Sequence, residues 1–381
     1  MAVGPDLVVL RALGLGDLLT AVPALRALHA ATEGRRVLLT PQALAPLVEP
    51  LGYEVLDVHG VRTLPATLPT VAAGARLGVN LHGRGPQSHR LMAALEPARL
   101  VGFAADGHEG PPWSEDEHEV ARWCRLLASA GIVADPEDLA IEPPDVPPPS
   151  GARGATLVHP GAASGARRWP AERWVEVVDA ERAAGRRVLI TGGAEERVRA
   201  RWIAARAGLA DDAVVAGRTS VAQLAAAVAV ASRLVCGDTG VAHLATALGT
   251  PSVVLFGPTS PAHWGPPPRA IHRVLWGGGT GDPHASDPDP GLLEIGTRDV
   301  LDALADLPES DGNAPIKLLG CGARTRVENG RDPSESPRGV LEHARDPRGQ
   351  AAIHAPARGP DDRLAAIARS RGERDQRPGA A

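Results

Sequence analysis

The stretch from Cys236 to Thr259, CGDTGVAHLATALGTPSVVLFGPT, predicts a strand, a turn, a helix and a second strand in succession. Apolar residues after the turn follow helical spacing, Gly249 suits the end of a helix, and PSVVLF is rich in β-branched residues. In a strand–turn–helix unit the first N–H groups of the helix point at one spot and favour an anion. Asp238, Thr239 and His243 gather around that spot. The stretch therefore predicts a site for an anionic ligand rich in hydroxyl groups.

The same alternation of strands and helices runs along most of the chain. Further strands are expected at LVVLRA, RRVLLT, EVLDV, RLGVNLHG, TLVHPG and RRVLITGG, with helical segments between them. Such alternation favours parallel, doubly wound sheets. The Pro- and Gly-rich segment IEPPDVPPPSGARG interrupts the pattern and predicts a linker. We therefore expect an α/β protein with two Rossmann-like doubly wound domains that face a cleft.

The predicted domain boundaries follow from these composition changes. Residues 1–142 form the first domain, residues 143–153 the linker and residues 154–307 the second domain. Residues 308–381 are rich in Arg, Pro, Gly and Asp, which predicts a disordered tail. An extension without function is the favoured interpretation, and a basic tail that binds a partner is the alternative.

Composition narrows the classes of function. The chain has 381 residues, of which 44% are hydrophobic and 22% charged, as expected of soluble globular domains. Its net charge of −5 argues against nucleic acid as a partner. Cys124, Cys236 and Cys321 are widely spaced, which favours a reduced, cytoplasmic compartment. No apolar run is long enough to span a membrane, and a peripheral contact with the inner membrane face stays open.

The first loop, in LRALGLGDLLTAVPALRAL, carries a candidate catalytic carboxylate. Gly14 and Gly16 allow a tight turn from strand to helix, and Asp17 lies where the helix begins. Taken alone, Asp17 is better explained as a helix cap, and the alternative is a carboxylate that faces the cleft. Leu19 stands where a dinucleotide fingerprint needs its third glycine, so a nicotinamide dehydrogenase is disfavoured.

Two later loops carry candidate contacts to a nucleotide diphosphate. In HPGAASGARRWPAERW, Arg167 and Arg168 precede a helix that is expected to begin at about Pro170. Guanidinium groups bind phosphate bidentately, although two surface arginines are also typical of a solvated loop. In TGGAEERVRA, Glu195 and Glu196 follow a strand and are expected to begin a helix. An acidic residue there binds ribose hydroxyls or stabilises the helix dipole, and both interpretations stay open.

The polar loop NLHGRGPQSHR at 80–90 offers a candidate acceptor site. His82, Arg84 and Arg90 suit an acceptor that carries hydroxyls, phosphates or carboxylates. An exposed loop with a structural histidine is the alternative. The chain has no HExxH motif and no paired Cys/His spacing, so no metal site is expected.

Together, four segments resemble glycosyltransferase family 9, the ADP-heptose:lipopolysaccharide heptosyltransferase family. They are RALGLGDLLTAVPALRAL, HPGAASGARRWPAERW, LITGGAEE and GDTGVAHLATALGTPSVVLFGPT, and the resemblance covers Leu7 to Leu307. It implies a GT-B fold, with the acceptor mainly in the first domain and the nucleotide sugar in the second. It also implies inversion at the anomeric centre with no metal and no cofactor beyond the nucleotide-diphosphate sugar as co-substrate.

The resemblance also implies roles for individual residues. Asp17 matches the carboxylate proposed as general base, and Arg167, where the family often has Lys, matches a contact to the donor phosphates, with Arg168 beside it. Glu195 or Glu196 matches the ribose-binding position. The DTGxxHL motif that cradles the donor is matched by Asp238, Thr239, Gly240 and His243.

The expected function is therefore transfer of a heptose-like sugar from ADP-heptose to a lipopolysaccharide-core or other cell-envelope glycan or glycolipid. The acceptor half matches the family least, and the tail has no counterpart in it. Two alternatives stay open: a GT-B sugar-nucleotide epimerase and a non-catalytic protein that binds a nucleotide sugar.

Overall fold

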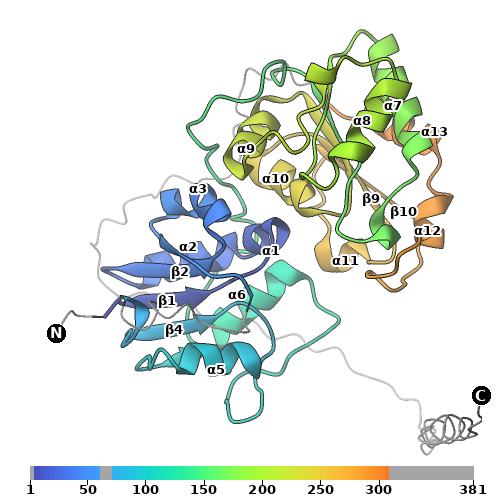
Figure 1. The fold of residues 1–381 in the computed structure, drawn as a ribbon. Coiled ribbons are helices and arrows are strands. Elements are labelled where there is room, and N and C mark those ends of the chain that lie inside the picture. The colour runs from blue at the N-terminus through green and yellow to red at the C-terminus, as the bar shows by residue number, and fades with distance from the viewer. Residues whose placement is uncertain (1–3, 61–70, 309–381) are drawn as a thin grey trace, which may run out of the picture. The chain divides into compact units, whose positions relative to one another are not determined.

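The computed structural model describes residues 4–60 and 71–308, which form two α/β halves, each with a five-stranded parallel sheet (Figure 1). Apart from Pro308, the predicted tail at 308–381 lies outside the described residues. Among the described residues, no helix combines the length and the apolar character that crossing a bilayer requires.

The N-terminal half has the strand order β3-β2-β1-β4-β5. Its strands are β1 (Leu7–Leu10), β2 (Arg36–Thr40), β3 (Glu54–Asp57), β4 (Leu77–Asn80) and β5 (Leu100–Val101). Its helices are α1 (Leu15–Thr20), α2 (Val22–Ala31), α3 (Ala45–Val48), α5 (Gln87–Ala93) and α6 (Glu119–Ser129), with short 3₁₀ helices at Gln42–Leu44 and Glu49–Leu51. The strand order reverses between β1 and β4, so the loops after these strands border the crevice where such sheets bind ligands.

The C-terminal half has the strand order β10-β9-β8-β6-β7. Its strands are β6 (Thr156–His159), β7 (Val188–Ile190), β8 (Arg233–Gly237), β9 (Ser252–Phe256) and β10 (His272–Trp276). Its helices are α7 (Ala171–Ala183), α8 (Arg197–Arg206), α9 (Val221–Val230), α10 (Gly240–Leu248), α11 (Pro261–Trp264), α12 (Pro290–Glu294) and α13 (Thr297–Ala305), with 3₁₀ helices at Gly165–Arg167 and Asp211–Ala213. Its order reverses between β6 and β8, where His159 pairs with Cys236.

Each sheet is covered on both faces, because successive residues of a strand point to opposite sides. In β1, Leu7 and Val9 pack with Trp123 of α6, whereas Val8 and Leu10 belong to a separate apolar cluster on the other face. Full burial of a Val or Leu side chain stabilises the fold by about 1.5–3 kcal/mol. The predicted arrangement of two doubly wound, Rossmann-like halves is confirmed.

The first turns of α1 and α10 lie against each other at a pair of glycines. A Cβ atom added to Gly240 would lie 3.0 Å from the Gly16 nitrogen, and one added to Gly16 would lie 2.9 Å from the His243 ring. Leu19 and Val22 of the N-terminal half also join the apolar cluster around α10. The missing side chains thus allow the two helix starts to approach closely.

Two predicted local structures are wrong. The loop expected at 80–90 is partly helical: α5 begins at Gln87, because the Arg90 N–H donates to the Pro86 carbonyl at 3.0 Å and closes a first turn. Glu195 and Glu196 precede α8 instead of beginning it, and the Glu196 carboxylate accepts a hydrogen bond from the Gly193 N–H at 2.6 Å. The prediction also omitted β5 and β10.

Candidate active site

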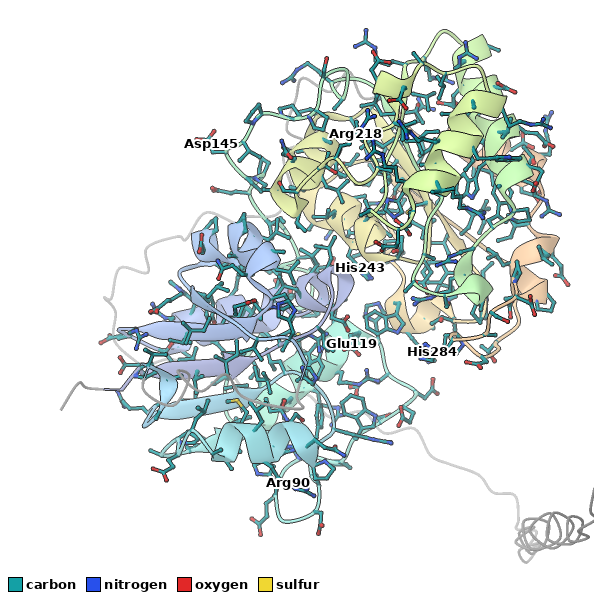
Figure 2. All side chains as sticks on the ribbon, viewed as in Figure 1. Arg90, Glu119, Asp145, Arg218, His243 and His284 are labelled. Atoms are coloured by element: carbon teal, nitrogen blue, oxygen red, sulfur yellow. The ribbon has the colours of Figure 1, made fainter. Side chains whose placement is uncertain are left out.

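A cavity of about 600 Å³ lies at the ends of β1, β6, β8 and β9. Its lining includes six of the residues predicted from sequence: Asp17, Arg167, Asp238, Thr239, Gly240 and His243. Figure 2 shows one of them, His243, on α10 beside α1. The cavity therefore combines the candidate base of the N-terminal half with the candidate donor site of the C-terminal half.

The start of α10 supplies N–H groups to this cavity. Thr239 is the N-cap in an extended conformation, and Gly240 is the first helical residue. The first N–H groups of a helix have no partner within it and carry the positive end of its dipole. Because Thr239, Gly240 and Val241 all line the cavity, this end of α10 favours an anionic group.

Asp238 is the buried carboxylate of the site, with 6% of its surface exposed. Burial raises the pKa of Asp238 to about 6, and the opposing effects of the Arg167 charge and a hydrogen bond with Thr259 do not cancel this. The side chain is therefore ionised at pH 7 but takes up a proton as the pH falls below about 6. It can accept hydrogen bonds from sugar hydroxyls in its ionised form.

We expect Asp238→Asn to stabilise the ligand-free protein at neutral pH. A raised carboxyl pKa means that the contribution of Asp238 to stability is full below about pH 4 and is lost as the pH rises through about 6. Between pH 4 and pH 7 the free energy of unfolding is expected to fall by on the order of 3 kcal/mol in the wild-type protein relative to the variant, at 1.36 kcal/mol per unit of pKa. Denaturant unfolding of both proteins at the two pH values measures this difference. An unchanged stability difference between the two pH values would contradict this account of Asp238.

Asp17 occupies the third position of α1. The geometry supports both interpretations of its role, as a helix cap and as a carboxylate that faces the cavity. Its Oδ2 accepts a hydrogen bond from the Gly14 N–H at 3.2 Å, as a capping carboxylate does. Its side chain is also 32% exposed and lines the cavity, and its Oδ1 lies 3.7 Å from the buried guanidinium of Arg11. The capping hydrogen bond uses Oδ2, so Oδ1, held near Arg11, is the oxygen that can meet a substrate.

The two adjacent arginines take different directions. Arg167 ends the 3₁₀ helix before α7 and lines the cavity, with Nε 3.4 Å from the Ser164 hydroxyl. Arg168 is not part of the lining, and its Nε donates to the Ala162 carbonyl at 2.9 Å. Only the first of the pair is therefore placed to meet a ligand in this cavity.

Neither Glu195 nor Glu196 lines the cavity. Glu195 is exposed, whereas the Glu196 carboxylate lies 3.7 Å from Nε2 of His159, a residue that does line it. The Nδ1 of His159 is hydrogen-bonded to the Thr191 hydroxyl at 2.9 Å, and burial lowers the His159 pKa. A ribose-binding role for either glutamate stays a prediction.

The three predicted acceptor residues also lie outside the cavity lining. His82 is half-buried after β4, and its burial, with the Arg11 charge, lowers its pKa to about 4. Arg84 pairs with Glu115 at 2.9 Å, and Arg90 is exposed on α5 (Figure 2). The structure does not bring these side chains together with Asp17, and their acceptor role stays a prediction.

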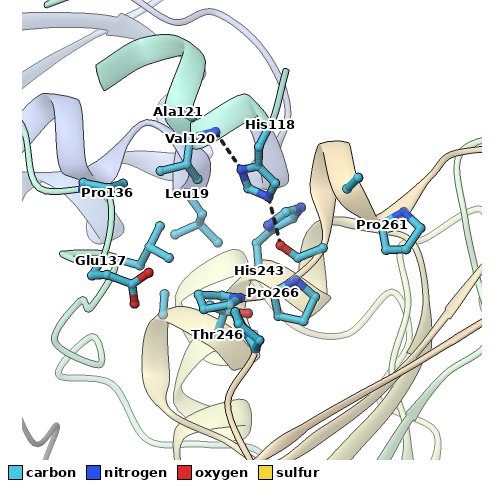
Figure 3. Close-up of a pocket in the computed structure, with 16 residues that line it drawn as sticks. Leu19, His118, Val120, Ala121, Pro136, Glu137, His243, Thr246, Pro261 and Pro266 are labelled. Carbon is cyan, nitrogen blue, oxygen red and sulfur yellow. Dashed lines mark hydrogen bonds between the residues drawn. The ribbon is translucent and has the colours of Figure 1, made fainter. Parts of the chain in front are cut away.

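His243 lines both the main cavity and a second, smaller one of about 270 Å³. Figure 3 shows the smaller cavity in close-up. Burial lowers the pKa of His243 to about 4, so its imidazole is neutral at physiological pH. The second cavity has a mainly apolar lining that includes Leu19, Val120 and Pro266. At its edge the His118 ring is hydrogen-bonded to the Gly265 carbonyl at 3.0 Å.

Sequence reasoning did not single out four polar or aromatic residues that line the main cavity: His159, Thr259, Trp264 and His284. The first two follow directly from strand order, because they lie at the ends of β6 and β9 on the edge that carries the site. Trp264 and His284 lie in a short helix and a loop that no sequence pattern predicts. Among residues 4–60 and 71–308, no three His, Cys, Asp or Glu side chains are arranged to hold a metal ion.

Comparison with known protein families gives one match. The model of glycosyltransferase family 9 (heptosyltransferase) matches residues 111–278, a segment that contains Arg167, Asp238 and His243 but not Asp17. No curated protein matches the sequence.

Three solved structures show the same fold. A family 9 glycosyl transferase from Veillonella parvula is 21% identical, with a TM-score of 0.63, over 80% of this chain and 98% of that one. Heptosyltransferase WaaC of E. coli with ADP is 20% identical, with a TM-score of 0.59, over 79% and 99%. The iron-containing heptosyltransferase TibC of E. coli, solved with ADP-D-β-D-heptose, is 16% identical, with a TM-score of 0.53, over 80% and 77%.

The family match confirms the resemblance in the three segments that it covers, from His159 to Thr259, and the structural matches confirm the GT-B fold. The protein is a glycosyltransferase of the GT-B fold, and its residues 111–278 carry the match to family 9 (heptosyltransferase).

Proposed function

We propose that this enzyme transfers a heptose-like sugar from ADP-heptose, with inversion, to a hydroxyl of a lipopolysaccharide-core or other cell-envelope glycan. The observation that carries the proposal is the cavity of about 600 Å³, which is lined by Asp17 from the N-terminal half and by Arg167 and the start of α10 from the C-terminal half. The family match and the ADP bound to WaaC support a nucleotide-diphosphate sugar as donor. The volume is in the usual range for a small-molecule site.

The donor diphosphate is proposed to bind Arg167 and the N–H groups of Thr239 and Gly240. These groups carry positive charge or partial positive charge and all line the cavity. They stabilise the charge that develops on the departing nucleoside diphosphate. Asp238, buried beside Arg167, is proposed to hold hydroxyls of the sugar or the ribose.

Asp17 is proposed to act as the general base. The acceptor oxygen attacks the anomeric carbon, the bond between that carbon and the diphosphate oxygen breaks, and the Asp17 carboxylate takes the hydroxyl proton. A carboxylate is a weak base, so the proton moves late, when positive charge on the sugar has made the attacking hydroxyl more acidic. Attack on the face opposite the leaving group inverts the configuration.

We also propose that the reaction needs no divalent metal, because Arg167 and the α10 N–H groups supply the charge stabilisation. TibC contains iron, so this point needs its own test. Turnover measured after EDTA treatment and desalting is expected to stay within about twofold of the untreated enzyme. A loss that returns on addition of Mg²⁺ or Fe²⁺ would contradict metal independence.

The proposed function is tested by incubating the enzyme with ADP-heptose, with and without an inner-core glycan acceptor. Release of ADP coupled to formation of a glycoside, with the anomeric configuration inverted by NMR, is the expected result. Consumption or isomerisation of the donor without an acceptor indicates an epimerase instead. Tight donor binding without turnover on a panel of glycan acceptors indicates a binding protein.

The cellular setting belongs to the same proposal. We place the enzyme in the cytoplasm, in peripheral contact with the inner membrane face, because the proposed acceptor is a glycolipid. Cys124 and Cys236 are unpaired, which fits a reducing compartment. Cell fractionation, with release of membrane-associated protein by high salt, tests this placement.

A further inference from the structure

A fully buried arginine lies directly beneath the candidate base. Arg11 follows β1 and has 1% of its surface exposed. Its Nε donates to the backbone carbonyl of Asp17 at 2.8 Å, and its Nη2 lies 3.3 Å from the Thr20 hydroxyl and 3.7 Å from Asp17 Oδ1. The Thr20 hydroxyl donates to the same Asp17 carbonyl at 2.9 Å. Arg11 thus contacts the first turn of α1 through both backbone and side chains.

Arg11 is itself held by α6. Glu119, the first residue of α6, accepts from Arg11 Nη2 at 3.0 Å, and the Trp123 ring lies under the guanidinium at 4.6 Å. The Trp123 Nε1–H donates to the same Glu119 oxygen at 3.0 Å. The other Glu119 oxygen accepts from Arg122. Because Glu119 is also buried, the position and direction of the Arg11 guanidinium are tightly defined.

We propose that Arg11 is the positioning residue of the transfer reaction: through its contacts to the Asp17 carbonyl and the Thr20 hydroxyl, it holds the Asp17 carboxylate at the cavity edge. This inference rests on the proposed function, in which Asp17 is the base. A planar guanidinium with several fixed donors can satisfy Asp17, Thr20 and Glu119 at once, whereas a lysine ammonium cannot keep the same set of directions. Glu119 in turn holds the Arg11 guanidinium in place.

The alternative is that Arg11 merely stabilises the fold as part of a buried ion pair. Arg122 provides the matched control, because it also pairs with Glu119 from a buried position and lies over an aromatic ring, that of Trp113, at 4.3 Å. Its side-chain hydrogen bonds and ion pairs in the described structure are with Ser114, Glu117 and Glu119, and none is with α1. A purely structural role predicts equal effects for both arginines.

The test compares Arg11→Lys with Arg122→Lys, each in the wild-type protein and in the Asp17→Asn protein. In the wild-type protein we expect Arg11→Lys to lower kcat about 10- to 100-fold while the Kd for ADP stays within twofold, and Arg122→Lys to change kcat less than threefold. In the Asp17→Asn protein, where the base is absent, Arg11→Lys should lower the residual rate less than threefold. Equal losses in both proteins, or a parallel loss of ADP affinity, would overturn the proposal.

Hydrogen exchange provides a readout that does not depend on turnover. Arg11→Lys should accelerate amide exchange at residues 14–20 at least tenfold without changing β1 and β2, and Arg122→Lys should leave residues 14–20 unchanged. Unchanged exchange in the Arg11 variant would overturn the positioning role even if no transfer is detected. If the Arg11→Lys protein does not fold, Glu119→Gln is used in its place. We expect it to lower kcat less than Arg11→Lys and to show the same exchange pattern. If the wild-type protein shows no transfer but the variants show this exchange pattern, the proposed function is wrong and Arg11 still positions Asp17.

Discussion

Asp17→Asn is expected to lower kcat for sugar transfer by about 10²–10⁴-fold, the usual contribution of a positioned general base. The amide cannot accept the proton of the attacking hydroxyl, but it keeps the size of the side chain. The Kd for ADP should stay within about twofold, because the donor contacts come from Arg167 and α10. Steady-state kinetics and calorimetry on the same preparation measure the two quantities.

Asp299→Asn is the matched control for this change. Asp299 occupies the same third position in α13 and accepts from the Gly296 N–H at 2.8 Å, but it does not line the cavity. In both variants the amide oxygen can still accept from the same backbone N–H, so both lose only a negative charge in the first turn, worth about 0.3–1 kcal/mol. Only Asp17→Asn should lose turnover. If Asp17→Asn keeps the wild-type kcat, or if Asp299→Asn loses as much kcat, Asp17 is only a helix cap and not the general base.

Arg167→Gln is expected to weaken ADP binding about 10- to 100-fold and to lower kcat for transfer as well. The substitution removes the cationic side chain of the cavity that comes from the 3₁₀ helix before α7. A hydrogen bond to a charged group contributes about 1.5–3 kcal/mol, which corresponds to this range of affinity. The effect on kcat follows because charge on the diphosphate increases as the glycosidic bond breaks.

Arg168→Gln tests whether the effect belongs to the site or to basic charge in general. It removes the same charge one residue away, from a side chain whose Nε is bound to the Ala162 carbonyl and which does not line the cavity. We expect its Kd for ADP to stay within threefold of the wild-type value. If both variants weaken ADP binding equally, Arg167 acts by long-range electrostatic attraction and not by a specific contact to phosphate.

The fold was largely predictable from the sequence. Buried parallel strands are short apolar runs that end at Gly or polar residues, and Cys236–Thr259 shows two of them around a helix. The short β5 (Leu100–Val101) was not predictable, because a strand of two residues has no periodicity of its own. The start of α5 was hidden by Pro86 and by polar residues typical of a loop, although a backbone hydrogen bond closes its first turn there.

The site was predictable where residues follow strands at the sheet edge, as Asp17, Arg167 and Asp238 do. The spacing of adjacent residues does not show which way their side chains point, so the sequence predicts Arg168 as a second phosphate contact, although Arg168 lies outside the cavity lining. The network of Arg11 and Glu119 joins residues 108 positions apart in the sequence. Only the packing of α6 against β1 and α1 brings such a pair together, and no local pattern reports it.

The most direct test of the central claim is a crystal structure of the protein with ADP bound. The account predicts the diphosphate within hydrogen-bond distance of the Thr239 and Gly240 N–H groups and of the Arg167 guanidinium, with its terminal phosphate directed toward Asp17. A diphosphate bound outside this cavity, or bound within it without contact to Arg167 and the start of α10, would contradict the account.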